Sequence, residues 1–379
     1  MKVLIVGAGI GGLTAALALL RGGIDVDVLE QAGALREVGA GVQLSANGTR
    51  ALHALGVLTD LLPVACEATG KEIRLWNTGE TWKLFDLGAQ SIERYGFPYL
   101  TLYRPDLLEV LAGAVRALKP DAIRLGTRVE AIDDFPHDAV IGADGVHSTI
   151  RQLLFGSDRP QFTGVIAWRG IVPIECLPRH LHRLVGTNWI GPGAHVVHYP
   201  LRGGRLMNFV GALERSDWRI ESWSTRGDPA ELAADFAGWH EDVQALIRGI
   251  DVPHKWALMV RPPLERWTAG RVTLLGDAAH SMLPFLAQGA VMAIEDGFLL
   301  ARSLKAHGVP EGLIRYEKAR IERTRRAVEA SAANIGRFHN RTLADAAAAK
   351  QYVDREWDET RVAERYEWLF RYDVTTAPV

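Results

Sequence analysis

The 379-residue sequence contains only two cysteines, Cys66 and Cys176. Two thiols are too few for a disulfide scaffold or a thiolate zinc site, so no metal centre is expected and a reducing compartment is favoured. An excess of one charge is also missing, because 43 Lys and Arg residues balance 45 Asp and Glu residues and the net charge is −2. No global electrostatic field would therefore attract nucleic acid or an anionic membrane.

Long apolar runs are absent as well. No stretch reaches the roughly 18 uninterrupted apolar residues that a membrane-spanning helix needs. The apolar N-terminus, MKVLIVGAGIGGLTAALALL, is broken by four glycines and lacks the continuous apolar region and cleavage site of a signal peptide. We therefore expect a cytoplasmic protein without a membrane partner.

The composition is that of a folded chain, with 48% hydrophobic and 23% charged residues, and it excludes a mostly disordered protein. At about 150 residues per domain, the length predicts two or three domains.

The N-terminal segment has the pattern strand, glycine turn, helix, strand, acid. A β-branched run at 2–6 leads into GAGIGG at 7–12, a helix-forming segment follows at 13–21, and a second β-rich run at 24–29 ends in Glu30. A carboxylate at the end of this second strand can accept hydrogen bonds from the hydroxyls of an adenosine ribose. Glu30 also argues against a 2′-phosphate at this position.

The glycines have separate roles in a G-x-G-x-x-G fingerprint. Gly7 permits the tight turn, Gly9 lets the backbone approach a pyrophosphate, and Gly12 lets the helix pack closely on the strand. The helix N-terminus directs unpaired N–H groups and a positive dipole end at the phosphates. The motif predicts a dinucleotide site but does not distinguish FAD from NAD.

Two further buried-type strands each deliver an aspartate into a glycine-flanked turn. The run at 139–143 precedes Asp144-Gly145, and the run at 272–275 precedes Gly276-Asp277. Ligands of open α/β sheets bind at this carboxyl end of the strands. Taken alone, such aspartates are more often turn residues or helix N-caps.

Together, the glycine motif at 7–12, the Asp-Gly motif at Asp144 and the Gly-Asp motif at Asp277 resemble those of the class A flavoprotein aromatic hydroxylases, which have the para-hydroxybenzoate hydroxylase fold. The resemblance extends from residue 1 to about residue 330. It is greatest to salicylate hydroxylase, 3-hydroxybenzoate 6-hydroxylase and 6-hydroxynicotinate 3-monooxygenase. It implies FAD as the cofactor and NADH or NADPH as co-substrate. No second G-x-G-x-x-G is present, which fits a family whose pyridine nucleotide binds transiently in a surface cleft.

The resemblance also implies site residues. Asp277 would bind the flavin ribityl chain, Asp144 would serve both FAD and the reduced nicotinamide, and Arg104 would lie near the FAD phosphates. A helix beginning near Gly289 would stabilise the anionic reduced flavin by on the order of 1 kcal/mol. The complete implied cofactor set is Gly7, Gly9, Gly12, Glu30, Gln31, Arg36, Gln43, Arg104, Val129, Asp144, Asp277, Gly289 and Ala290.

The implied fold is α/β, with a Rossmann-like FAD-binding domain, an interleaved and mostly antiparallel β-sheet substrate domain, and a helical C-terminus. The expected boundaries are 1–70, 100–160 and 265–310 for the FAD-binding domain, 71–99 and 161–264 for the sheet domain, and 311–379 for the C-terminal helices. Patterning agrees with this division, because 163–173 alternates as a strand and 195–213 is typical of a hairpin with its turn at Arg202-Gly203-Gly204.

The hairpin supplies the candidate catalytic residues. His195, Val197 and Tyr199 share one strand face, with His198 on the other. His195 and Tyr199 could hold a phenol and remove its proton; alternatively, Tyr199 is a core aromatic and His195 sits at the rim. The resemblance favours the catalytic pair, because related hydroxylases place a His and a Tyr at this spacing.

We expect an apolar substrate pocket lined by Trp168, Met207, Pro284 and Phe285, with a guanidinium or a backbone donor holding a carboxylate. Pyridine-acting relatives tend to carry histidines where this chain has Gln43 and Phe285, which favours a carbocyclic substrate. One departure from the family is the shortened segment at 130–137, where a longer hairpin is usual.

The resulting hypothesis is an FAD-dependent monooxygenase that uses NAD(P)H and O₂ to hydroxylate a small aromatic acid through a flavin C4a-hydroperoxide. Salicylate, converted to catechol, is the favoured substrate, and 3-hydroxybenzoate or 6-hydroxynicotinate is the alternative. A flavin oxidase or dehydrogenase and a non-catalytic FAD-binding protein are alternatives of other classes. The protein is expected to be a monomer or a homodimer.

Overall fold

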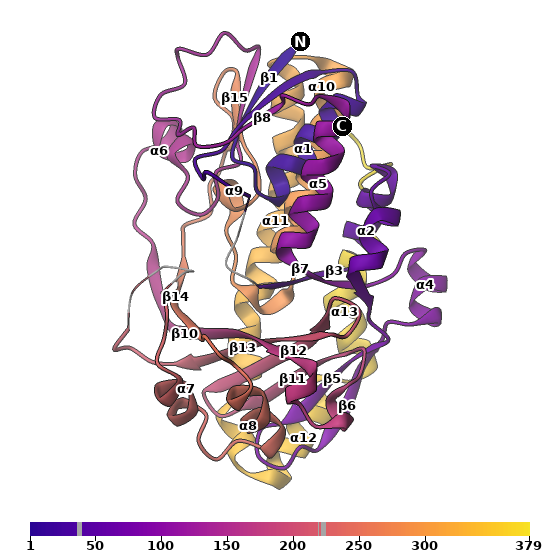
Figure 1. Cartoon of the computed structure of the whole chain (residues 1–379), viewed down its shortest axis with the longest axis vertical. Coiled ribbons are helices and arrows are strands. Elements are labelled where there is room, and N and C mark those ends of the chain that lie inside the picture. Colours follow the sequence, from indigo (N-terminus) through magenta and orange to yellow (C-terminus); the bar gives the residue numbers. More distant parts are fainter. Residues whose placement is uncertain (36–39, 219, 221–224) are drawn as a thin grey trace.

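The computed structural model describes residues 1–35, 40–218, 220 and 225–379. Its upper half in Figure 1 contains a five-stranded parallel sheet with the strand order β15-β9-β1-β2-β8. The strands are β1 (Lys2–Val6), β2 (Asp25–Leu29), β8 (Ile123–Arg124), β9 (Ala139–Gly142) and β15 (Val272–Leu274).

Helices cover this parallel sheet, which explains why its central strands β1 and β9 are almost continuously apolar. Helix α1 (Ile10–Arg21) packs against α5 (Arg104–Leu118) and against α10 (Gly289–His307). The predicted strand at 2–6, the helix after the glycine turn and the helix start at Gly289 are confirmed.

A seven-stranded sheet forms the lower half of the molecule (Figure 1), with the strand order β14-β10-β13-β12-β11-β5-β6. The strands are β5 (Gly70–Leu75), β6 (Thr81–Asp86), β10 (Gln161–Pro173), β11 (Val185–Gly191), β12 (Ala194–Leu201), β13 (Leu206–Glu214) and β14 (His254–Val260). The predicted hairpin is confirmed as β12 and β13, and its turn has positive φ at Arg202, Gly203 and Gly204.

The two faces of the large sheet have different neighbours. One face forms a second apolar core with α7 (Pro229–Asp235) and α8 (Glu241–Arg248), to which Trp168, Trp189 and Phe209 contribute. The other face looks toward the parallel sheet and forms a wall of the cavity described below.

A small sheet with the order β3-β7-β4 joins the halves, and the 28-residue helix α11 (Glu311–Phe338) runs along the length of the molecule (Figure 1). The strands of the small sheet are β3 (Gly41–Leu44), β4 (Ala65–Glu67) and β7 (Leu100–Tyr103). The remaining helices are α2 (Ala46–Ala54), α3 (Leu58–Leu61), α4 (Ala89–Tyr95), α6 (Thr149–Phe155), α9 (Asp277–His280), α12 (Ala346–Glu356) and α13 (Glu359–Phe370).

The predicted fold class is therefore confirmed: a parallel Rossmann-like sheet, a mostly antiparallel second sheet and a helical C-terminus. The domain boundaries stay predictions. Residues 125–138, which include the shortened segment, form turns and irregular structure. In the described part of the chain, no helix combines the length and apolar character needed to cross a bilayer.

Candidate functional site

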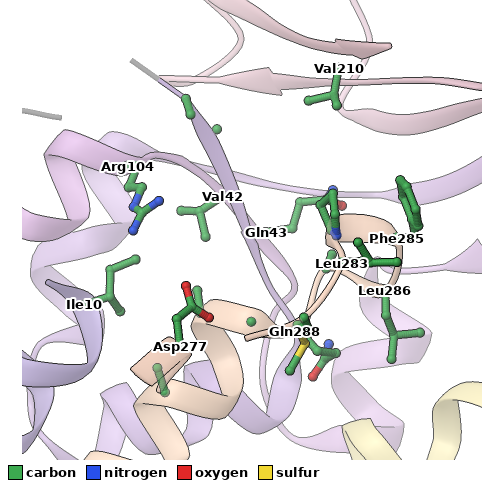
Figure 2. Close-up of a pocket in the computed structure, with 18 of the residues that line it drawn as sticks. Ile10, Val42, Gln43, Arg104, Val210, Asp277, Leu283, Phe285, Leu286 and Gln288 are labelled. Carbon is green, nitrogen blue, oxygen red and sulfur yellow. The ribbon is translucent and has the colours of Figure 1, made fainter. Parts of the chain in front are cut away.

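A large cavity lies between the carboxyl end of the parallel sheet and the inner face of the seven-stranded sheet. Its lining includes the glycine turn at Gly9, the start of α5 at Arg104, the turn at Asp277 and the start of α10 at Gly289. Figure 2 shows the charged ends of Arg104 and Asp277 pointing into this cavity, with Gln43 between these residues and the Phe285 loop.

The glycine turn has the geometry that its motif predicts. Gly7 has φ of +107°, and a Cβ atom there would lie 2.4 Å from the carbonyl oxygen of Ala143. A Cβ atom on Gly12 would lie 2.0 Å from the carbonyl oxygen of Gly7. At Gly9 a Cβ atom would have no neighbour within 4 Å, so the backbone there is open to the cavity. Helix α1 begins beside Gly9 without a side-chain cap, which leaves its N–H groups available to an anion.

Asp277 is held by a buried ion-pair network. Asp296 of α10 accepts a hydrogen bond from the backbone N–H of Gly276 at 3.1 Å and lies 2.6 Å from Nε2 of His280. The Arg320 guanidinium of α11 bonds Asp296 at 2.6 Å and Glu295 at 2.7 Å, and all three side chains are fully buried. Because the turn is fastened on both sides, the exposed Asp277 carboxylate is directed into the cavity.

The Asp144 carboxylate makes the helix-capping contacts that the sequence left open as the alternative, and its cofactor role stays a prediction. Its carboxylate accepts hydrogen bonds from the Ser148 hydroxyl at 2.5 Å and from the N–H groups of Thr149 and Ile150 at 2.7 and 3.1 Å. It therefore caps the N-terminus of α6. Burial raises the pKa of Asp144, and these hydrogen bonds oppose the rise. The backbone of the adjacent Gly145, rather than the Asp144 side chain, lines the cavity.

Three of the predicted cofactor residues, Glu30, Gln31 and Val129, lie outside the cavity lining. Glu30 accepts hydrogen bonds from the N–H groups of Ala8 and Ala32, both at 2.8 Å. Gln31 is exposed and Val129 is buried. Arg36 lies outside the described residues. Their cofactor roles stay predictions.

The start of α10 provides a second uncapped helix N-terminus. Gly289 and Ala290 line the cavity, and no side chain caps the helix. The preceding Gln288 donates to the Ser45 hydroxyl at 3.0 Å, which fixes the loop that carries Pro284 and Phe285. Both of these predicted residues line the cavity.

Residues on alternate positions of the large sheet form the opposite wall. His195, Val197 and Tyr199 line the cavity, as their common strand face predicts, and His198 is buried on the other face. Four residues along a strand span roughly 13 Å, so the backbone positions of His195 and Tyr199 lie well apart along this wall.

Two of the predicted pocket residues do not line the cavity. Trp168 and Met207 are fully buried in the second apolar core, on the far face of the sheet. Side chains alternate between the faces of a strand, and the next residue on each strand, Arg169 or Asn208, lines the cavity instead.

Lys71 and Asn208 are site residues that the sequence interpretation missed. Lys71 of β5 lines the cavity and donates to the Tyr99 hydroxyl at 3.4 Å, and no carboxylate pairs with it in the described chain. Burial lowers its pKa to about 8. Asn208 uses its side-chain oxygen to accept from the Gly41 N–H at 2.9 Å, whereas its buried Nδ2 has no partner among the described residues. The register of the hairpin could have identified Asn208, because it pairs Asn208 with Tyr199 and paired residues share one face of the sheet.

Lys71 and Tyr199 are neighbours across the sheet because Gly186 lies between them. A Cβ atom on Gly186 would lie 3.4 Å from Cγ of Lys71 and 3.9 Å from Cβ of Tyr199. One end of this wall therefore contains a cation and two polar groups, from Lys71, Tyr199 and Asn208. His195 lies at the other end.

The lining residues fit FAD. The open Gly9 backbone and the uncapped α1 match a pyrophosphate, Asp277 offers acceptors for ribityl hydroxyls, and the uncapped α10 start suits an anionic flavin edge. This fit rests on the cavity's donor and acceptor set.

Comparisons with known proteins agree with this fit. A family model described as an FAD binding domain matches residues 1–138 and 122–331. The chain is 39% identical over 397 residues to 3-amino-4-hydroxybenzoate 2-monooxygenase of Streptomyces platensis, covering 100% of this chain and 97% of the relative. It is 34% identical over 407 residues to 3-hydroxybenzoate 6-hydroxylase of Polaromonas naphthalenivorans, covering 99% and 96%. The structure of Klebsiella pneumoniae HpxO complexed with FAD and uric acid has a TM-score of 0.82 and 27% identity, covering 100% of this chain and 97% of that one.

Proposed function

The chain belongs to the FAD-binding domain family and is a flavoprotein aromatic monooxygenase, and we propose that its substrate is a small hydroxybenzoate, with NADH or NADPH as co-substrate. The observation that carries this proposal is a single cavity that joins the glycine turn, Asp277 and the start of α10 to Lys71, Asn208 and His195. FAD, when bound, supplies the redox chemistry and the activation of O₂.

The polar groups on the wall suit the two ends of a hydroxybenzoate. The Lys71 ammonium and the Asn208 amide can donate to a ring carboxylate, which is the partner that neither has within the described chain. Burying the Asn208 Nδ2 without a partner is costly, and a bound carboxylate removes that cost. It also gives the Lys71 ammonium an opposite charge, where the described chain offers it the neutral Tyr99 hydroxyl at 3.4 Å. The ring hydroxyl then extends toward His195.

His195 can act as the base for the hydroxyl. Its Nδ1 lies 2.7 Å from Nε2 of His339, so Nε2 is the ring nitrogen left to face the cavity. Burial lowers the pKa of His195 well below 6.5, so the ring is neutral and has a lone pair for a proton. Removing the phenolic proton makes the aromatic ring electron-rich, which is what an electrophilic oxygen donor requires.

Apolar side chains close the His195 end. The Phe285 ring centroid lies 4.9 Å from that of His195, and the Phe338 centroid lies 5.1 Å from it. Excluding water from this region strengthens the polar contacts with the substrate and prevents wasteful side reactions.

The identity of the hydroxybenzoate is the finer part of the proposal. Salicylate is the substrate that the sequence interpretation favours, whereas the two relatives above are named for 3-amino-4-hydroxybenzoate and 3-hydroxybenzoate. An acid whose hydroxyl is meta or para to the carboxylate better suits a wall with Lys71 and His195 at opposite ends. We therefore favour such an acid over salicylate.

The test is a screen of NADH and NADPH oxidation by the FAD-loaded protein. The panel is salicylate, 3-hydroxybenzoate, 4-hydroxybenzoate, 3-amino-4-hydroxybenzoate, gentisate and 6-hydroxynicotinate, with each product identified by mass spectrometry. We expect one carbocyclic acid to accelerate oxidation and to gain one oxygen atom. Product identification is needed because an effector can stimulate NADH oxidation without being hydroxylated. Nucleotide oxidation that no acid on the panel converts into a hydroxylated product would refute the proposal.

A further inference from the structure

A line of three side chains leads from the cavity to the surface behind His195. Nδ1 of His195 is hydrogen-bonded to Nε2 of His339 at 2.7 Å. Nδ1 of His339 lies 3.3 Å from a carboxylate oxygen of Glu214, an ion-pair contact that a small rotation of the carboxylate would turn into a hydrogen bond. The side chain of His339 is 1% exposed and that of Glu214 is 37% exposed. The line therefore begins in a dry region and ends at solvent.

The backbone holds this line in place. The carbonyl oxygen of His339 accepts from the N–H of Gly193 at 3.1 Å, and the carbonyl oxygen of Gly193 accepts from the N–H of Glu214 at 2.9 Å. The tight turn between β11 and β12 thus fastens the end of α11 to the end of β13. His339 is positioned relative to both of its side-chain neighbours without depending on the site's ligands.

The surroundings favour proton transfer along the line rather than a trapped charge. Phe285 and Phe338 border His195, and the groups that face His339 are Glu214 and, next to it, Arg341, whose guanidinium bonds Glu214 at 2.5 Å. Burial lowers the pKa of both histidines. Each neutral ring carries one N–H and one lone pair, so a proton can enter one nitrogen while another leaves by the opposite nitrogen.

We propose that His339 and Glu214 form a proton relay that carries the phenolic proton of the substrate from His195 to solvent. This inference rests on the proposed function and adds two residues to it. His195 is the catalytic base, and His339 and Glu214 act through it.

The proton balance is simple. The phenol O–H bond breaks and an N–H forms at Nε2 of His195; the Nδ1 proton of His195 moves to Nε2 of His339; and the Nδ1 proton of His339 moves to the Glu214 carboxylate and from there to water. No electron pair leaves the chain and no co-reactant is needed. The reverse sequence returns a proton to the product phenolate and restores both rings.

The relay requires both rings to begin as the Nδ1–H tautomer, whereas neutral histidine in water favours Nε2–H. In protein labelled with ¹⁵N-histidine, NMR should therefore show protonated Nδ1 on both rings, assigned with His195→Gln and His339→Gln among the 12 histidines. This measurement needs no substrate. A protonated Nε2 on His339 in the resting protein would overturn the relay.

The kinetic test compares two variants that break the same surface ion pair. Glu214→Gln keeps an oxygen that can accept the His339 N–H but cannot take its proton, whereas Arg341→Gln leaves the carboxylate in place. With 3-hydroxybenzoate and 3-amino-4-hydroxybenzoate as probes, a pH indicator in weak buffer records proton release on binding. We expect Glu214→Gln to slow release by about 10- to 100-fold, with an unchanged KM, and Arg341→Gln to stay within about twofold of the wild type.

The outcomes separate the two proposals. Wild-type protein that hydroxylates an acid, together with a Glu214→Gln variant that releases protons at the wild-type rate, would overturn the relay and leave the proposed function intact. Wild-type protein that hydroxylates none of the acids would overturn the proposed function itself, and the relay with it.

Discussion

Replacing Lys71 by methionine should weaken ligand binding and stabilise the empty protein at the same time. Methionine keeps much of the length and volume of lysine but has no charge. Since a hydrogen bond to a charged group contributes about 1.5–3 kcal/mol, the loss should raise the Kd of a carboxylate ligand by roughly 10- to 150-fold, at 1.4 kcal/mol per factor of ten.

The stability effect has the opposite sign. Burial lowers the pKa of Lys71 from 10.5 to about 8, which means that the folded protein disfavours the charged form. At about 1.4 kcal/mol per pKa unit, the penalty removed by the substitution is at most roughly 3.5 kcal/mol at pH 7. In the wild type this penalty is fully present below pH 8. Between pH 8 and 10.5 the unfolded state binds more protons at Lys71 than the folded state, so the free energy of unfolding rises with pH and the penalty disappears.

Benzoate is the best ligand for this test, because it has the carboxylate but no phenolic proton. Its Kd, measured by flavin absorbance, should be flat below pH 8 in the wild type. Above pH 8 it should rise by up to about tenfold per pH unit, because the empty protein must then take up a proton to bind. In Lys71→Met the Kd should be high and independent of pH.

The matched control is Lys83→Met on the neighbouring strand β6, where the lysine side chain is 71% exposed. It should leave both the benzoate Kd and the melting temperature unchanged. A Lys71→Met protein with wild-type benzoate affinity at pH 7, or with a lower melting temperature than the wild type, would refute this reasoning.

Three further substitutions probe other parts of the site. Asp277→Ala should yield protein with a low ratio of flavin to protein absorbance, because the carboxylate that faces the cofactor cavity is lost; a fully loaded preparation would contradict that role. Tyr199→Phe should lower the rate of hydroxylation more than the rate of flavin reduction in stopped-flow traces, and equal losses would count against a substrate role. Arg320→Met removes the guanidinium that pairs with the buried Asp296, whereas Glu295 keeps Arg323. Urea unfolding should reveal a loss of about 3–5 kcal/mol; a loss below about 1 kcal/mol would show that the Arg320 pair is not needed.

Local pattern was enough to predict the elements that surround the cofactor cavity. The strand at 2–6, the glycine turn and the helix start at Gly289 all lie where the sequence predicts them, because each depends on neighbouring residues and on the special backbone freedom of glycine. The hairpin at 195–213 was predictable for the same reason, since its glycine turn fixes the strand register.

Met207 was assigned to the wrong face of the large sheet because the strand register was not used to choose the face. With Arg202-Gly203-Gly204 as the turn, Tyr199 pairs with Asn208, so Asn208 faces the cavity and Met207 faces away. The side-chain position of Asp144 is a different case. Its carboxylate could serve a ligand or cap a helix, and only the orientation of α6 decides between the two.

The sequence by itself determined the glycine turn and the helix that follows it, because a dinucleotide motif is a continuous segment whose chemistry is local. Tertiary structure decided which further residues join His195 and Tyr199 on the substrate wall. Lys71 reaches the cavity because β5 pairs in parallel with β11, and His339 reaches His195 because α11 ends beside the turn between β11 and β12. These contacts join residues more than 100 positions apart, and their positions depend on how whole sheets and helices pack, which local periodicity does not encode.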